Sequence, residues 1–563
     1  MASEQARGGR RRGGPRGHAV DPAARAEVEA LLDGSARSRE HLIEHLHRLQ
    51  DRYGHLSAAH LVALAEWLRL APVEVYEVAS FYHHFDVLAP GEAPPPLTVR
   101  VCASVSCALF GAGALADALA ATLGPGVRVR RVPCVGRCDT APVAIVGDRP
   151  VPYANPAKVV AQLAAGTDAP VQRPAWLDYA AYRARGGYAL LQACVAGRRP
   201  LDAVLATLAD AGLRGLGGAG FPAARKWQTV RGYPGPRLLV ANLDEGEPGT
   251  FKDRHCLETD PHRFFEGLLI AAWAVEAAAV YLYVRDEYPE CRALLAAELA
   301  ALAADPPCAL PPIHLRRGAG AYICGEESAL IESIEGRRGM PRLRPPYVAE
   351  RGLFGRPTLA HNVETLYWLR EILERGADWF RGHGRHGRQG LRAYSVSGRV
   401  VRPGVKLAPA GITLNELVDE HCGGLLPGHT LYAYFPGGAS GGILPAHLAD
   451  LPLDFDTLQP YGCFIGSAAV IVLSQHDSVR AAALNAMRFF ADESCGQCTP
   501  CRVGTARAAG LMAQPVWDAA LLADLATVMR EASICGLGQA APNTFACALK
   551  YFPEEFDRPG GAP

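Results

Sequence analysis

The stretch Glu493-Ser-Cys495-Gly-Gln-Cys498-Thr-Pro-Cys501-Arg502 holds three cysteines at CxxCxxC spacing, and a fourth cysteine follows at Cys535. This spacing can turn three thiolates towards one point, and a distant fourth completes the set. Four thiolates around a cubane are what a 4Fe–4S cluster requires. The stretch therefore predicts a 4Fe–4S site in the last part of the chain.

A second cysteine quartet lies near the N-terminus, with Cys102 and Cys107 at CxxxxC spacing and Cys134 and Cys138 at CxxxC spacing. Two ligand pairs suit a 2Fe–2S cluster, which takes two thiolates on each iron. Structural zinc is the alternative for both quartets, because four-thiolate zinc sites also use closely spaced cysteines. Zinc sites usually pair CxxC with CxxC, so these spacings favour iron–sulfur clusters.

The other eight of the 16 cysteines show no pair spacing. A disulfide framework is not expected in a chain of 563 residues that shows no signal peptide, so we expect a cytoplasmic protein. These unpaired cysteines are Cys194, Cys256, Cys291, Cys308, Cys324, Cys422, Cys463 and Cys547.

The overall composition excludes several classes of partner. Basic and acidic residues balance at 57 each, so no global charge favours nucleic acid. No apolar run is long enough to span a bilayer, and we expect no membrane insertion. The first 20 residues are rich in arginine and glycine and are predicted to be a disordered basic tail.

The N-terminal third changes pattern near residue 90. Apolar residues at helical spacing predict helices between residues 24 and 88, with Ser57 as a cap and Pro72 at a helix start. A strand–helix–strand pattern follows and places the first cysteine quartet in loops at strand ends, as in a thioredoxin-like unit. Its predicted elements are strands at 97–102, 127–132 and 143–146 and a helix at 113–123.

The rest of the chain divides into four segments. Residues 166–190 are predicted to be a polar connector, and a long α/β region runs to about residue 385. Short β-rich runs between about 391 and 478, separated by glycines, fit a small β-grasp insert. The remaining residues are predicted to form helices around the CxxCxxC cysteines.

Glycine-rich and acidic turns in the α/β region predict a nucleotide site. Glycines within 212–220 let the backbone approach a phosphate, and Asn242 and the acidic residues after it follow a buried strand. A second strand is predicted to end in an acidic turn at 320–327. Any one of these turns could be a solvated loop or a helix cap, but together they favour ribityl, ribose and phosphate binding.

These motifs closely resemble the flavin subunit of respiratory complex I and its soluble relatives. Residues from about 25 to 165 resemble the small 2Fe–2S subunit of the same module, so the chain looks like a fusion of the two. The motifs that carry the resemblance are Gly215–Pro222, Asp244–Arg254, Cys324–Leu330, Asn362–Leu366, Ser494–Arg502 and, for the small subunit, Val75–Tyr82.

Four further motifs look most like the β subunit of soluble NAD-dependent formate dehydrogenases, which carries diaphorase activity. They are Asp260–Gly267, Met340–Tyr347, Tyr461–Ser467 and Lys550–Phe556. This resemblance implies electron transfer between iron–sulfur clusters and NAD(H) through FMN, with formate oxidised in a partner α subunit that carries molybdopterin with Mo or W. The alternatives are the diaphorase subunit of an NAD-linked hydrogenase, a fused complex I module, or a non-catalytic iron–sulfur scaffold.

The resemblance also implies a multidomain α/β fold. Its parts are a helical plus thioredoxin-like N-terminal region, a Rossmann-like FMN domain, a β-grasp insert and a C-terminal helical iron–sulfur bundle. The implied boundaries are 1–20 for the tail, 21–89 for the helical subdomain, 95–166 for the 2Fe–2S domain, 190–388 for the FMN/NAD domain, 389–478 for the β-grasp (SLBB-like) domain and 479–563 for the 4Fe–4S domain.

The family's cofactor contacts carry over onto matching residues. No residue is expected to act as acid or base, because hydride passes directly to flavin N5. FMN is implied to be held by Gly215, Gly217, Gly218, Lys226, Asn242, Asp244, Glu245, Gly325, Glu326, Asn362 and Thr365. NAD(H) is implied to contact Phe221, Glu247, Glu327, Arg344 and Tyr347.

Four positions depart from the complex I pattern. Leu216 stands where arginine is usual, Ala224 where glycine is usual, and Thr229 replaces an aromatic residue. Leu216 and Thr229 bear on the NAD contacts. His361 stands where asparagine is usual and puts one contact with the FMN phosphate in doubt.

Overall fold

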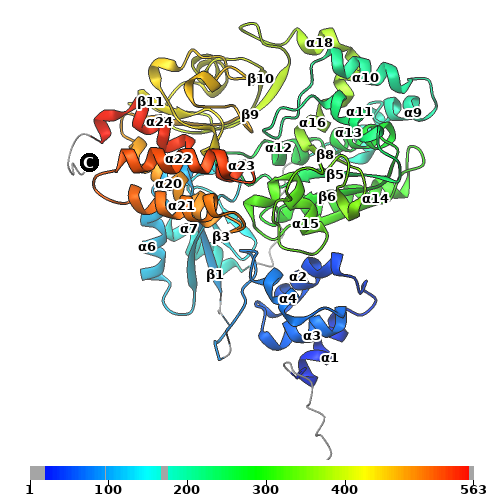
Figure 1. The fold of residues 1–563 in the computed structure, drawn as a ribbon, viewed down its shortest axis with the longest axis horizontal. Coiled ribbons are helices and arrows are strands. Elements are labelled where there is room, and N and C mark those ends of the chain that lie inside the picture. The colour runs from blue at the N-terminus through cyan, green and yellow to red at the C-terminus, as the bar shows by residue number, and fades with distance from the viewer. Residues whose placement is uncertain (1–18, 90, 95–96, 167–174, 557–563) are drawn as a thin grey trace, which may run out of the picture. The chain divides into compact units, whose positions relative to one another are not determined.

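The computed structural model describes residues 19–89, 91–94, 97–166 and 175–556 (Figure 1). These residues divide into two compact units. The helical unit lies within residues 19–94 apart from 82–84, and the large unit comprises 82–84 and the described residues from 97 onward. All but the last two residues of the predicted basic tail lie outside the described residues.

Polar caps and proline set the helix starts of the helical unit. The side chain of Asp21 accepts hydrogen bonds from the backbone of the first helical turn, and Ser57 caps the third helix through the His60 amide at 3.1 Å. Leu46 and Leu64 are fully buried in its core. The predicted helices are therefore confirmed as α1 (Pro22–Leu31), α2 (Leu42–Tyr53), α3 (Ala58–Leu68) and α4 (Pro72–Ala79).

The large unit begins with a four-stranded sheet of order β2-β1-β3-β4. The central strand β1 pairs in parallel with β2 and antiparallel with β3, which is the mixed sheet expected of a thioredoxin-like domain. Alternate residues Val99 and Val101 point into the core, where Leu119 packs. The elements are β1 (Thr98–Cys102), α5 (Val105–Leu109), α6 (Ala112–Thr122), β2 (Arg128–Val132), β3 (Ala144–Val146), β4 (Arg149–Val151) and α7 (Pro156–Ala165).

A parallel sheet of order β7-β6-β5-β8 forms the next domain. The chain leaves β5 towards β6 and β7 on one side and returns to β8 on the other, so the strand order reverses between β5 and β8. Ligands of open α/β sheets bind at this switch point, beyond the carboxyl ends of the strands. The strands are β5 (Arg237–Leu243), β6 (Ala277–Val284), β7 (Ile313–Arg317) and β8 (Thr358–Asn362).

Helices surround this parallel sheet (Figure 1). The long helix α13 packs on β5 and β6, and α11 packs on β8. The helices are α8 (Tyr179–Ala184), α9 (Ala189–Val195), α10 (Leu201–Asp210), α11 (Ala223–Arg231), α12 (Lys252–Thr259), α13 (Pro261–Ala274), α14 (Pro289–Ala304), α15 (Glu327–Ile334), α16 (Val363–Tyr367), α17 (Leu369–Arg375) and α18 (Ala377–Arg381).

Two local predictions for this domain are wrong. The second half of the predicted connector is helical, because its tyrosines are buried against α13: Tyr182 donates to Glu266 at 2.6 Å, and the Tyr188 hydroxyl lies 2.7 Å from His262 Nδ1. The predicted strand at 320–324 is instead the short 3-10 segment η3 (Tyr322–Gly325), since the strand β7 has already ended at Arg317.

The predicted β-grasp insert is a five-stranded sheet of order β10-β9-β13-β11-β12. Its first and last long strands, β9 and β13, lie side by side in parallel at the centre, as a β-grasp sheet requires. Tyr394, Val396, Ile471 and Val472 are fully buried. The elements are β9 (Leu391–Gly398), β10 (Gly404–Pro409), α19 (Leu414–Glu416), β11 (Leu431–Phe435), β12 (Leu444–Pro445) and β13 (Ala469–Ser474).

The last domain is a helical bundle, as predicted. Helix α20 reaches the thioredoxin-like domain, where Asn485 donates to the Ala103 carbonyl at 2.7 Å. Two cysteines without pair spacing also meet here, because Cys463 of the β-grasp domain and Cys547 of α24 have sulfur atoms 3.6 Å apart. The helices are α20 (Val479–Asp492), α21 (Thr499–Met512), α22 (Ala519–Ala532), α23 (Gly536–Ala540) and α24 (Asn543–Tyr551). Among the described residues, no helix has the length and hydropathy needed to cross a bilayer.

Close packing of α13 against α16 allows a test of this fold. A Cβ placed at Gly267 would lie 2.0 Å from the Leu366 carbonyl oxygen, so Gly267→Ala should destabilise the protein by about 1–3 kcal/mol or more. Gly510 in α21 is the matched control, because a Cβ there meets no atom and alanine should stabilise by up to about 1 kcal/mol. Thermal unfolding followed by circular dichroism measures both, and equal midpoints for the two variants would contradict the packing.

Candidate cofactor sites

A cavity of about 520 Å³ opens beyond the carboxyl ends of β5 and β8, at the switch point of the parallel sheet. Its volume is typical of small-molecule sites. The glycine-rich loop before α11 and the turns after β5 and β7 supply one side of it, and loops of the β-grasp domain with helix α23 supply the other. Segments that are distant in the sequence therefore converge on one cavity.

Nine of the predicted cofactor residues line this cavity. They come from the glycine loop, the end of β5, the η3 turn and the end of β8. These residues are Gly217, Gly218, Asn242, Asp244, Glu245, Glu247, Gly325, Glu326 and Asn362.

Glycine is required where the loop approaches β8. A Cβ at Gly217 would lie 2.9 Å from the Asn362 Cβ, and Gly218 has a φ of 134°. A side chain at Gly217 would collide with Asn362, and a side chain at Gly218 would strain the backbone. The loop therefore presents bare backbone amides to the cavity, which is the chemistry that a phosphate or ribityl chain needs.

Acidic side chains line the cavity after β5. Burial raises the pKa of Asp244 well above its usual range, and burial followed by the charge of Asp253 raises the pKa of Glu245 to about 7. Burial also raises the pKa of Glu247, whose carboxylate accepts from the Ser440 amide at 2.8 Å and from the Tyr322 hydroxyl. Hydroxyl groups of a bound nucleotide would find acceptors here.

Seven predicted residues do not line the cavity. Gly215 and Thr365 shape its loop, since the Gly215 amide donates to the Phe221 carbonyl and the Leu216 amide donates to Thr365 Oγ1, both at 2.8 Å. The aromatic side chains of Phe221 and Tyr347 are 45% and 58% exposed. The remaining three, Lys226, Glu327 and Arg344, form ion pairs.

Those three charged residues form a chain at the surface beside the glycine loop. Lys226 Nζ lies 2.9 Å from Glu327, and Arg344 contacts both Glu327, at 3.4 Å, and Glu326. Burial opposes ionisation of Glu327, but the charge of Lys226 lowers the pKa of that carboxyl. Lys226 is thus neutralised in part rather than standing as an isolated positive charge.

Sequence reasoning missed several residues of the cavity. Lys252 lines it, is 1% exposed, and pairs with Asp253 at 2.7 Å and Glu364 at 3.0 Å. A lysine is rare in this arginine-rich chain, and its place inside a motif was a signal that could have found it. Ser440 and Phe464 come from the β-grasp domain, far along the sequence from the glycine loop and the turn after β5, so no local pattern pointed to them.

The CxxCxxC cysteines and Cys535, which the sequence predicts to bind the 4Fe–4S cluster, line one small cavity. Cys495 and Cys498 lie in the loop before α21, Cys501 lies in the first turn of α21, and Cys535 directly precedes α23. This donor set fits a 4Fe–4S cluster. Ile323 and Leu537 line both this cysteine cavity and the 520 Å³ cavity, so a single layer of side chains separates the two sites.

The other quartet also comes together. Cys102 ends β1, Cys107 lies in α5, and the other two lie in the loop after β2, all four at most 3% exposed. The sulfur atoms of Cys134 and Cys138 are 3.4 Å apart, and contact with Cys107 and then Cys134 raises the pKa of Cys102. Four buried thiols that face one another fit a 2Fe–2S cluster.

Arg285 connects this quartet to the large cavity. Its guanidinium donates to the Cys134 carbonyl at 2.7 Å and to the Glu245 carbonyl. Tyr288 adds a 3.1 Å hydrogen bond to the Glu245 carboxylate, and Arg254 donates to the Gly136 carbonyl at 3.3 Å. The loop that carries two cysteines is thereby fixed to the acidic turn of the cavity.

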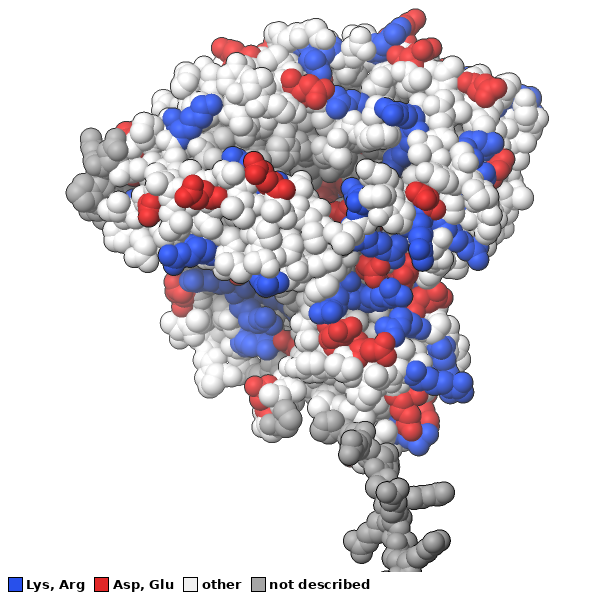
Figure 2. Space-filling view, viewed as in Figure 1, with Lys and Arg blue, Asp and Glu red and all other residues white. Residues whose placement is uncertain are grey.

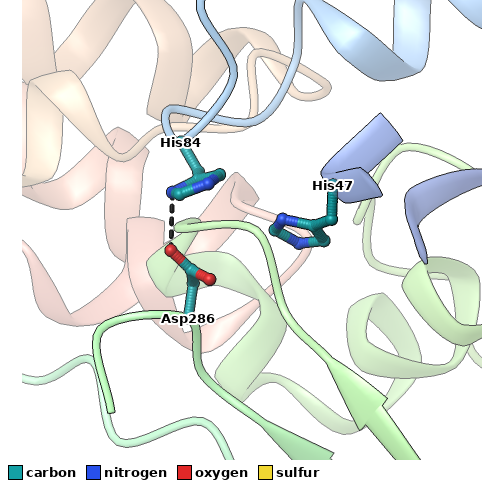
Figure 3. Close-up of side chains that lie close together, drawn as sticks. All are labelled: His47, His84 and Asp286. Atoms are coloured by element: carbon teal, nitrogen blue, oxygen red, sulfur yellow. Dashed lines mark ion pairs between the residues drawn. The ribbon is translucent and has the colours of Figure 1, made fainter. Parts of the chain in front are cut away.

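Residues 82–84 pack with the large unit. His84 Nδ1 lies 2.5 Å from Asp286, the pair shown in Figure 3, and Tyr82 donates to the Arg337 carbonyl at 2.8 Å.

Acidic and basic side chains are interspersed over the face shown in Figure 2, in keeping with the balanced composition.

Comparison with protein families identifies three domains. Residues 208–371 match the Nuo51 FMN-binding domain, residues 28–166 match a thioredoxin-like 2Fe-2S ferredoxin, and residues 481–559 match the NADH-ubiquinone oxidoreductase-F iron-sulfur binding region. The cofactors FMN, 2Fe–2S and 4Fe–4S thus follow from three independent matches, which agree with the sites described above.

Relatives along most of the chain place the protein in one family. An NADH-quinone oxidoreductase subunit of Rhizobium meliloti is 40% identical over 390 residues, which are 67% of this chain and 92% of that protein. The mitochondrial NADH dehydrogenase flavoprotein 1 of Dictyostelium discoideum is 41% identical over 378 residues, 63% of this chain and 79% of that one. The chain belongs to the family of 51 kDa flavin and iron–sulfur subunits of NADH-quinone oxidoreductases.

A solved structure resembles the chain over nearly its whole length. It belongs to an NAD+-reducing NiFe hydrogenase in the H2-reduced state, with 34% sequence identity and a TM-score of 0.81 over 93% of each chain. The predicted multidomain fold is therefore confirmed. The chain is an NAD(H)-dependent flavin and iron–sulfur oxidoreductase.

His361, the residue that put one contact with the FMN phosphate in doubt, lies outside the lining of the large cavity and has a structural role. Its Nε2 accepts from Trp227 Nε1 at 2.7 Å. Burial, and then the charge of Lys226, lowers its pKa to about 3. A neutral histidine thus joins β8 to α11.

This buried histidine predicts acid sensitivity. The unfolded chain binds a proton at His361 below about pH 6.5 and the folded chain does not, so lowering the pH from 7 to 5 should remove about 2 kcal/mol of stability through this group. His361→Asn should flatten that part of the pH dependence. Urea unfolding at pH 7 and pH 5 measures it, and an unchanged difference between the two pH values in the variant would contradict the assignment.

The cysteine cavity predicts a selective loss of iron. Cys498→Ala should remove the 4Fe–4S cluster and lower the iron content by about four atoms per chain, with the 2Fe–2S signal retained. Cys308→Ala is the matched control, because Cys308 lies outside both quartets. Iron analysis and electron paramagnetic resonance check this, and a Cys498→Ala protein with full iron content would exclude Cys498 as a ligand.

Proposed function

We propose that the chain is the diaphorase subunit of a multi-subunit NAD+-reducing enzyme, a soluble formate dehydrogenase. The observation that supports the diaphorase role is that Ile323 and Leu537 line both the large cavity and the four-cysteine cavity. FMN supplies the exchange between hydride, a two-electron carrier, and the one-electron chemistry of clusters. A flavin in the large cavity would lie against the cluster that receives or delivers those electrons.

The proposed FMN contacts divide into two groups. The backbone amides of the glycine loop and Asn362 line the cavity and would hold the phosphate and ribityl chain, while Asn242 and Asp244, at the end of β5, would accept hydrogen bonds from hydroxyls. Thr365 and Gly215 act by holding the loop in shape. Lys226, near the start of α11, would supply a positive charge that its ion pair with Glu327 partly neutralises.

Of the proposed NAD(H) contacts, Glu247 lines the large cavity and the other four lie outside its lining. Phe221 and Tyr347 leave aromatic surface exposed for an adenine ring, and Arg344 and Glu327 offer polar groups beside them. Glu247 is proposed as a ribose contact, although its carboxylate already accepts from Ser440 and Tyr322. A bound ribose would therefore share or replace those hydrogen bonds.

The proposed partner subunit performs the substrate chemistry. The motifs Asp260–Gly267, Met340–Tyr347, Tyr461–Ser467 and Lys550–Phe556 support a formate dehydrogenase α subunit that carries molybdopterin with Mo or W. Electrons would enter through the clusters and leave as hydride to NAD+. A NiFe hydrogenase is the second candidate, because the solved hydrogenase chain shares the whole fused architecture.

Anaerobic purification with the native partners decides between these two enzymes. We expect the purified complex to reduce NAD+ with formate. Its metal analysis should show molybdenum or tungsten in a fixed ratio to this chain and no nickel. NAD+ reduction driven by H2, with nickel, would overturn the formate assignment. NADH-to-ferricyanide activity of the same preparation is the control that shows an intact flavin site, and its absence in a flavin-free protein would favour the non-catalytic scaffold.

A further inference from the structure

A second cavity lies on the other side of the glycine-rich loop. It has a volume of about 220 Å³ and shares no lining residue with the 520 Å³ cavity. Leu213, Arg214 and Leu216 of the loop form one wall. The β-grasp domain and the segment that leads into it form the others, so this cavity lies where the two domains meet.

Positive charge dominates this second cavity. Arg214, Arg388 and Arg392 line it, and Asp454 is the one carboxylate in the lining. Asp454 is shared, since it accepts from Arg388 at 2.9 Å and from Arg392 at 2.7 Å. Arg214 pairs outside the lining with Asp456, at 2.5 Å. The cavity thus retains more positive than negative charge.

Arg392 is buried and incompletely paired. Its residue is 3% exposed, and among the described residues its Nε has no hydrogen-bond partner. An unpaired buried N–H bears the full cost of its desolvation unless a ligand or water accepts from it. This nitrogen is itself enclosed by protein atoms, so what Arg392 contributes to the cavity is its fixed positive charge.

An aromatic ring holds two of the guanidinium groups in place. The Cζ atoms of Arg392 and Arg214 lie 3.9 Å and 4.3 Å from the centre of the Phe455 ring. Stacking of this kind fixes the planar forks, and fixed guanidinium forks match the oxygens of phosphate groups.

We propose that this arginine cavity binds a small oxyanion of the phosphate class, either inorganic phosphate or the phosphate end of a small monoester. A volume of about 220 Å³ is several times the share of one water molecule in the liquid, about 30 Å³, and admits such a group. Bound there, the anion braces the Leu213–Leu216 stretch. The same stretch also anchors the glycine-rich loop of the large cavity, because the Leu216 amide donates a hydrogen bond to Thr365.

Phosphate titration of the flavin-loaded full chain tests the site. Equilibrium dialysis with labelled inorganic phosphate, and separately with glycerol phosphate, at constant ionic strength should show one saturable site per chain. The thermal midpoint should rise with phosphate but not with equivalent chloride. Saturable binding of either ligand supports the site, and the tighter of the two identifies its source.

Two variants and one control locate the binding. Arg392→Met removes the buried fork, and Gln389→Glu adds a negative charge to the lining without a change of size, so each should weaken binding by about tenfold or more. Arg385→Gln should bind as the unmodified protein does, because Arg385 pairs with Glu420 outside the cavity. Gln389→Glu keeps the test valid if Arg392→Met does not fold.

Three results would overturn the proposal. Equal affinity in Gln389→Glu and the unmodified protein would place the anion elsewhere. Binding that does not saturate, or that chloride replaces, would mean an adventitious ion only. Displacement of labelled phosphate by added FMN, in protein prepared without flavin, would assign the arginine cavity to the flavin site itself.

Discussion

The contact of the large cavity with the four-cysteine cavity through Ile323 and Leu537 is the constraint on which the rest of the structure depends. One-electron transfer between a flavin and a cluster requires that they lie close together. Cys535 directly precedes helix α23, and residues of α23 line the large cavity. The helical bundle is therefore held beside the cavity at the carboxyl ends of the parallel strands, and loops of the β-grasp domain line the same cavity.

Polar links also join the thioredoxin-like domain to its neighbours. Arg285 joins the carbonyl of a cysteine in the thioredoxin-like domain to the acidic turn after β5. Ser106 and Ser397 meet at 2.9 Å between that domain and the β-grasp sheet. Satisfied buried hydrogen bonds rigidify the loop that carries two cysteines, which suits a protein whose electron transfer depends on the separation of its centres.

Sequence patterns predicted those parts of the site that local chemistry determines. Cysteine spacing and acids at a strand end identify their sites because ligands must come from short, regular segments. The prediction of a strand at 320–324 was wrong, because a stretch with glycines and two apolar residues can form a 3-10 turn as well as a strand. Ser440, Phe464 and the buried ion pairs of Lys252 depend on tertiary contacts between distant segments, so no spacing could reveal them.

Rapid mixing of the oxidised chain with NADH, followed by freeze-quenching and electron paramagnetic resonance, tests the central claim most directly. If the flavin cavity adjoins the four-cysteine cluster, the reduced cluster signals should appear together with the loss of flavin absorbance, without any added mediator. Flavin bleaching with both clusters still oxidised, in a sample whose clusters dithionite reduces, would contradict the account.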